Sequence, residues 1–186
     1  MESELTTDSG WIEIDASPAH EQANAEELRA ALVDASKLWL AHDGLWFQEW
    51  EKHHGMEEAI AADTAAWRRF ARLEAERIMA RLGLAPGGGI PALVLCLRHR
   101  LYANICRLAL QQRGELQLKL RMVDCRVQEA RARKGLAPFP CKCVGEVEFA
   151  VFAATVDARF SVTSLQAPPD EPSAGGWCEW LFELQA

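Results

Sequence analysis

The hydrophobic pattern of the chain changes its period at Gly114. Before this glycine, apolar residues recur every three to four positions over long segments, which is typical of amphipathic helices. After it, apolar and polar residues alternate from Leu116 to Met122, which predicts a strand with one buried face. A chain that follows first the helical and then the strand period fits neither an all-helical nor an all-β fold.

The first predicted helix begins at Asn24, which can form a capping box with Glu27, and ends at Gly55. Asp43–Gly44 lies in the middle of its apolar pattern. Because glycine weakens a helix interior, we expect a bend or break there that brings Trp46 against the body of the domain.

Two more helices are predicted in the first half of the chain. One spans residues 56–82, and the other spans residues 91–114 and is apolar on most of its sides. A helix that is apolar all round belongs in the centre of a domain, so we expect Cys96 and Cys106 to be buried in its surroundings.

The second half of the chain mixes strands and helices. Helices are predicted over residues 126–134 and 144–155, and strands over residues 116–122, 160–163 and 178–184. The prediction is therefore an α+β fold, in which a helical N-terminal half packs on a small antiparallel sheet of about three strands in a β-α-α-β-β C-terminal half.

Composition places the chain among globular proteins. Its length suits one domain, for which we expect residues 24–186, after an irregular segment of residues 1–23. The formal net charge is −7, and the arginines form no stripe, which argues against a nucleic-acid partner. No apolar run reaches the roughly 20 residues of a membrane span, and the N-terminus has no apolar signal core. We expect a cytoplasmic protein with reduced thiols and no membrane contact; a homodimer stays open.

The cysteines are the strongest candidates for a functional site. Cys125, Cys141, Cys143 and Cys178 all lie in the last third of the chain, at the ends of predicted elements. Thiolates bind zinc or iron in fours, or in threes with another ligand, so a metal site is one interpretation. A catalytic thiol at Cys125, Cys141 or Cys178 is a second, and buried inert thiols are a third.

Five further residues are predicted to contact a ligand: Glu129, Arg131, Lys142, Asp43 and Trp46. Cys125 and Glu129 share one face of the helix that follows Cys125, and the start of a helix favours a thiolate. Arg131 and Lys142 are cations that could attract an anionic group. Asp43, beside Trp46 in the first helix, completes the set of candidate ligand-binding residues.

Three stretches together resemble domain-of-unknown-function family 6125, small cytosolic proteins of anaerobic bacteria and archaea. They are residues 43–47, residues 125–142, and the Pro-Pro-Asp turn at residues 168–170 with the Trp-Cys-Glu-Trp run at residues 177–180. The resemblance covers about Asn24 to the C-terminus. It implies no particular activity.

The chain departs from the pattern of that family at one point. The pattern places a Cys-x-x-Cys before the Pro-Pro-Asp turn, where this chain has Ser164 and Ala167, so Cys125, Cys141 and Cys178 are the matching thiols. A late cysteine on a closing strand is also loosely similar to the aminothiazoline-carboxylate hydrolase family and to vinyl-reductase-like ligand-binding domains.

Three functions follow as hypotheses from these residues and this resemblance. The first is a small-molecule or metal-binding domain whose site contains Cys125, Cys141 and Cys178. The second is a cysteine-dependent hydrolase that acts on a C–N bond of a cyclic amidine or amide-like substrate. The third is a structural or interaction domain in which every cysteine belongs to the core.

Overall fold

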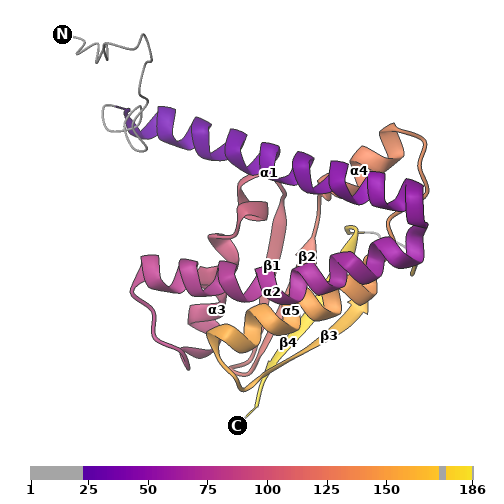
Figure 1. Ribbon diagram of the computed structural model, residues 1–186. Helices are drawn as coiled ribbons and strands as arrows, with labels where there is room; N and C mark the ends of the chain where they lie inside the picture. The colour runs from indigo at the N-terminus through magenta and orange to yellow at the C-terminus, as the bar shows by residue number, and fades with distance from the viewer. Residues whose placement is uncertain (1–22, 172–174, 186) are drawn as a thin grey trace, which may run out of the picture.

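The computed structural model describes residues 23–171 and 175–185; all but the last residue of the predicted irregular segment lies outside them. The described part of the chain is helical up to residue 98, and all its strands lie after it, together with two further α-helices (Figure 1). The elements are α1 (Ala25–His54), α2 (Met56–Leu82), α3 (Gly89–Arg98), the short 3-10 helix η2 (Leu101–Asn104), β1 (Leu108–Arg113), β2 (Gln117–Met122), α4 (Arg126–Arg133), α5 (Lys142–Val156), β3 (Phe160–Gln166) and β4 (Cys178–Leu184). The fold is α+β, as predicted.

The four strands form one antiparallel sheet in the order β1-β2-β4-β3. In the central pair, Leu120 lies opposite Trp180 and Met122 lies opposite Cys178. Because side chains alternate between the two faces of a strand, this register puts Leu118, Leu120, Trp180 and Phe182 on the same buried face. That face carries the hydrophobic core.

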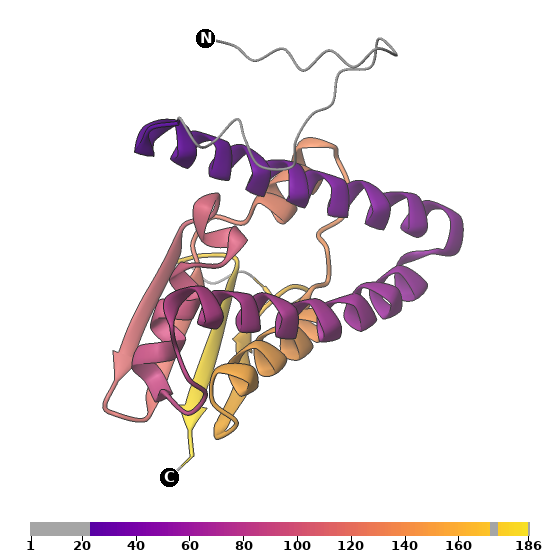
Figure 2. The same ribbon diagram turned by 60° about the vertical axis from the view of Figure 1, so that its left-hand side comes forward.

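The helices cover this one face in successive layers (Figures 1 and 2). α5 lies against β3 and the core, and α2 runs along α5. α1 lies beyond α2, joined to it at Gly55, and reaches across to η2 and α4. Phe149 and Phe152 of α5 fill the space between α2 and the sheet.

The prediction of the third helix is wrong for its second half. The helix ends at Arg98, and the chain then forms η2 and the strand β1, which the sequence pattern had assigned to the helix. Residues 108–113 pair along their whole length with residues 117–122, so they supply the hydrogen bonds that the edge of β2 would otherwise lack. The sheet therefore has four strands where about three were expected.

The predicted bend at Asp43–Gly44 is also absent. α1 continues through Gly44, and Trp46 is 65% exposed on its surface, where its indole donates to His42 (3.2 Å). A mid-helix glycine costs about 1 kcal/mol, which is less than the loss of the helical hydrogen bonds on either side of a break. The predicted capping box of Asn24 with Glu27 is present.

None of the helices in residues 23–171 and 175–185 combines the length and the apolar character needed to cross a membrane.

Candidate functional site

A cavity of about 90 Å³ lies between the sheet, α5, α4 and η2. Its walls are mainly apolar and aromatic, with Trp67, Phe149 and Trp180 among them. We call it the inner cavity. The polar groups that reach it are few, and they include the thiols of Cys106, Cys125, Cys141 and Cys178.

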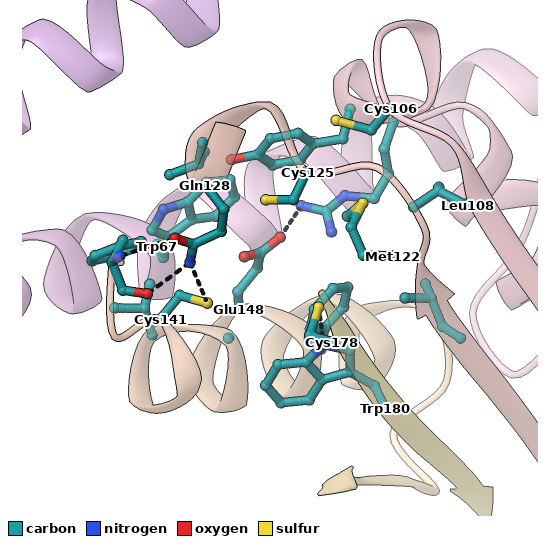
Figure 3. Close-up of a pocket in the computed structure, with 18 of the residues that line it drawn as sticks. Trp67, Cys106, Leu108, Met122, Cys125, Gln128, Cys141, Glu148, Cys178 and Trp180 are labelled. Atoms are coloured by element: carbon teal, nitrogen blue, oxygen red, sulfur yellow. Dashed lines mark hydrogen bonds and ion pairs between the residues drawn. The ribbon is translucent and has the colours of Figure 1, made fainter. Parts of the chain in front are cut away.

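The structure brings Cys125, Cys141 and Cys178 to this cavity from three different elements (Figure 3). Cys125 precedes the first residue of α4, Cys141 precedes the first residue of α5, and Cys178 opens β4. Cys178 is paired with Met122, three residues before Cys125, so the register of β2 and β4 places these two thiols at the same end of the sheet.

Gln128 brings the third cysteine into place. Its side-chain amide is buried and donates to the carbonyl of Phe139 (2.7 Å), while its carbonyl accepts from the Phe139 backbone N–H (3.0 Å). These two hydrogen bonds hold the segment before α5 against α4. The same amide nitrogen lies 3.8 Å from the Cys141 sulfur.

The other cysteines are distributed differently. Cys143 is exposed, with its sulfur 3.9 Å from the Pro140 carbonyl, and does not line the inner cavity. Cys96 is buried in the core, as expected. Cys106 contradicts its prediction, because it follows η2, is only half-buried, and reaches the inner cavity.

Burial keeps the cavity thiols protonated. Loss of hydration raises the pKa of Cys125 to about 12 and that of Cys178 to about 11, and it raises the pKa of Cys141 well above its ordinary value. The expected thiolate at Cys125 is therefore not supported: the start of the short helix α4 favours the charged form, but desolvation outweighs it.

A buried ion cluster forms one wall of the cavity. Arg100 lies between Glu74 and Glu148, and its guanidinium nitrogen Nη2 is 2.8 Å from Glu74 Oε2 and 2.7 Å from Glu148 Oε1. Burial lowers the pKa of Arg100, but the two carboxylates more than offset this and raise it above its ordinary value. Burial raises the pKa of Glu148, although the charge of Arg100 opposes the shift.

A second cavity of about 340 Å³, the outer cavity, lies between α1, α2 and α4. It shares Trp67, Tyr102, Val127 and Phe139 with the inner cavity, so these side chains form the partition between them. Two carboxyl groups, Asp43 and Asp63, face the outer cavity together with several lysine and arginine side chains. Burial and the nearby charges of Asp43 and Glu148 raise the pKa of Asp63 to about 7.

The predicted ligand-binding cations have other partners. Arg131 lines the outer cavity, but its guanidinium forms two hydrogen bonds with Glu51 (2.7 and 2.9 Å) and donates to the Ala137 carbonyl (2.6 Å). Lys142 forms an ion pair with Asp170 at 2.8 Å and lines neither cavity. Both cations are therefore engaged within the protein.

Of the remaining predicted contacts, Asp43 lines the outer cavity, whereas Glu129 and Trp46 line neither cavity. Trp46 points away from the body because it lies on the exposed side of α1.

Across the described residues, no three His, Cys, Asp or Glu side chains are grouped closely enough to hold a metal ion. The four cysteines proposed as zinc or iron ligands include the exposed Cys143, which is separate from the other three. Ligation also requires deprotonated thiols, and burial disfavours them here. The residues present therefore fit a zinc or iron centre poorly.

Sequence reasoning missed three polar members of the site: Arg100, Tyr102 and Glu148. Glu148 had a readable signal, because it is a single carboxylate on the apolar face of α5 that also carries Val144 and Phe152. Arg100 and Tyr102 had none, since they fall where the expected helix is broken.

The sequence matches the model of a family of unknown function, DUF6125, over residues 21–184. No curated protein matches the chain. Because the family model covers most of its length, the chain belongs to the DUF6125 family.

Proposed function

We propose that this member of the DUF6125 family is a cytoplasmic small-molecule-binding domain whose ligand occupies the inner cavity. The observation that carries the proposal is the convergence of Cys125, Cys141 and Cys178 with the Glu148 carboxylate on one mainly apolar cavity. Apolar cavities with a few convergent polar groups are the usual form of small-molecule sites. All six cysteines are free, which supports a reducing compartment.

The outer cavity supports the same proposal as a route of entry and as space for the rest of a ligand. It adjoins the inner cavity at Trp67, Tyr102, Val127 and Phe139, and it is the larger of the two. A ligand with its small end among the thiols would reach the outer cavity once these side chains move apart.

The hydrolase hypothesis has less support. A nucleophilic cysteine acts as a thiolate and is usually paired with a base. Here the thiols of Cys125 and Cys178 have raised pKa values, and none of the described residues lining the inner cavity is a histidine. The purely structural hypothesis accounts for Cys96, which is buried in the core. It gives no reason why the cysteines at the ends of three different elements line one cavity.

Selective ¹³C labelling of the methionine methyl groups tests the proposal, because Met122 lines the inner cavity and Met79 is buried elsewhere in the core. We expect isobutanol at millimolar concentration to shift the Met122 signal and to leave Met79 unchanged. Cys141→Leu should abolish the shift by filling the cavity.

Cys143→Leu is the matched control, since the same change is made two residues away at an exposed position. If isobutanol, isobutylamine and isobutyrate all leave Met122 unchanged in the unmodified protein, the inner cavity is not a small-molecule site.

A further inference from the structure

The charges around the inner cavity do not balance. Two carboxylates, Glu74 and Glu148, share the single guanidinium of Arg100, and the three side chains are only 6%, 12% and 3% exposed. With both carboxylates ionised, the cluster carries one net negative charge in the interior. Buried charge without a partner is costly, so such a cluster either takes up a proton, for which the raised pKa of Glu148 is a sign, or gains a further positive group.

The deficit falls on Glu148. Glu74 accepts from Arg100 Nε (2.8 Å) at one oxygen and from the Leu101 backbone N–H (3.2 Å) at the other, so both of its oxygens have donors. Glu148 forms an ion pair with Arg100 through Oε1 (2.7 Å). Its side chain projects from α5 between the thiols of Cys125, Cys141 and Cys178 (Figure 3). The less compensated carboxylate is thus the one that the cavity presents to a ligand.

The rest of the wall also favours a cation. Arg100 is the one cationic side chain among the described residues that line the inner cavity, and it is already shared. The thiols are neutral. The rings of Trp67 and Tyr102 already lie against the Arg100 guanidinium, 5.8 and 5.7 Å from the ring centroids. The ring of Trp180 also lines the cavity, and aromatic faces attract cations in a desolvated site.

Size limits the group that can enter. The inner cavity, at about 90 Å³, is smaller than the cavities of about 150 Å³ that hold benzene. A protonated amine or amidine on a short aliphatic or branched chain suits this space, with any larger part of the ligand in the outer cavity.

We propose that the inner cavity binds the protonated amino or amidino group of a small organic cation, which forms a salt bridge with Glu148. This inference rests on the proposed small-molecule function and specifies the class of ligand. It places the cationic end of the ligand at Glu148, beside the three thiols.

The test compares three molecules of the same branched shape: isobutylamine, isobutanol and isobutyrate, which are cationic, neutral and anionic at pH 7.5. Each is titrated into the full chain while the Met122 methyl signal is followed. Because an ammonium group compensates the charge of Glu148 and a hydroxyl group does not, we expect isobutylamine to bind about tenfold more tightly than isobutanol, and isobutyrate to bind most weakly.

Glu148→Gln should remove the preference for the amine, whereas Glu146→Gln, an exposed position on the same helix, should retain it. Equal or tighter binding of isobutanol or isobutyrate to the unmodified protein would overturn the inference and leave the proposed function intact. Binding of none of the three would overturn both. The comparison in the unmodified protein decides the question even where Glu148→Gln fails to fold.

Discussion

Two helices of this protein, α1 and α5, both follow a helical period, but α5 is the more apolar of the two and they differ sharply in burial. Of the 30 residues of α1, Ser36 and Leu40 are buried; of the 15 residues of α5, seven are buried. α5 lies between the sheet and α2, whereas α1 has neighbours along one side. The difference teaches that an amphipathic pattern predicts a helix, while its packing partners decide how much of it is covered.

The apolar side chains of α1 show this directly. Trp39 packs against Trp67, Phe70 and Tyr102, where α2 and η2 face it. Other apolar side chains of the same helix remain exposed, namely Leu28, Leu32, Leu38, Leu45, Trp46 and Trp50. Four predictions test how closely α1 is packed, by comparison with α5.

The largest effect is expected from truncating an aromatic side chain in each helix. Phe152→Ala in α5 removes a fully buried ring and should lower the free energy of unfolding by about 3–5 kcal/mol. Trp46→Ala in α1 removes a largely exposed ring and should change it by less than about 0.5 kcal/mol. Urea unfolding followed by circular dichroism measures both. A cost above about 2 kcal/mol for Trp46→Ala would show that α1 is covered in solution.

The ion pair between Glu51 of α1 and Arg131 of α4 should give a smaller effect. Glu51→Gln replaces a charged hydrogen-bond partner of the buried Arg131. It should lower the free energy of unfolding by about 1.5–3 kcal/mol at pH 7. Glu49→Gln, at an exposed position of the same helix, should cost almost nothing.

The same pair predicts a pH dependence. Hydrogen bonds from Arg131 lower the pKa of Glu51 below its ordinary value of 4.5. A lowered pKa in the folded state stabilises the protein above the unfolded pKa, and this contribution is lost as the pH falls through the lowered value. The free energy of unfolding, measured between pH 7 and pH 2.5, should fall less steeply with decreasing pH in Glu51→Gln than in the unmodified protein. Equal slopes would contradict a stabilising role for this pair.

The smallest effects, of opposite sign, are expected at the two mid-helix glycines. A Cβ at Gly145 of α5 would lie 2.6 Å from the Trp180 ring, so Gly145→Ala should destabilise the protein by about 1–3 kcal/mol. A Cβ at Gly44 of α1 meets only the Gln48 side chain at 3.8 Å, so Gly44→Ala should stabilise it by about 0.5–1 kcal/mol. Destabilisation by both changes would mean that α1 is as closely packed as α5.

Much of the secondary structure could be predicted from the sequence. The bounds of α2 and β4, the capping box at Asn24 and the α+β class all follow from local period and capping residues. The strand β1 could not, because the apolar residues at 105, 108 and 110 fit a helix as well as a strand. Its pairing with β2, a contact between two segments, decides its conformation.

The candidate site divides in the same way. The sequence placed Cys125, Cys141 and Cys178 at the ends of elements, and the register of β2 with β4 and the Gln128 hydrogen bonds bring them to one cavity. The sequence did not indicate that Arg131 forms an ion pair with Glu51 and Lys142 with Asp170, since neither partner is close in the chain.

The sequence by itself determined most of the helices and strands of this protein, β1 and the end of α3 excepted, because period, caps and glycines act within a few residues. Only the tertiary structure decided which groups are desolvated, and so which thiols stay protonated and which carboxylate, Glu148, shares its counter-charge beside a cavity. The physical reason is that desolvation and charge pairing depend on atoms brought together from distant parts of the chain, whereas helical and strand periods depend on neighbours.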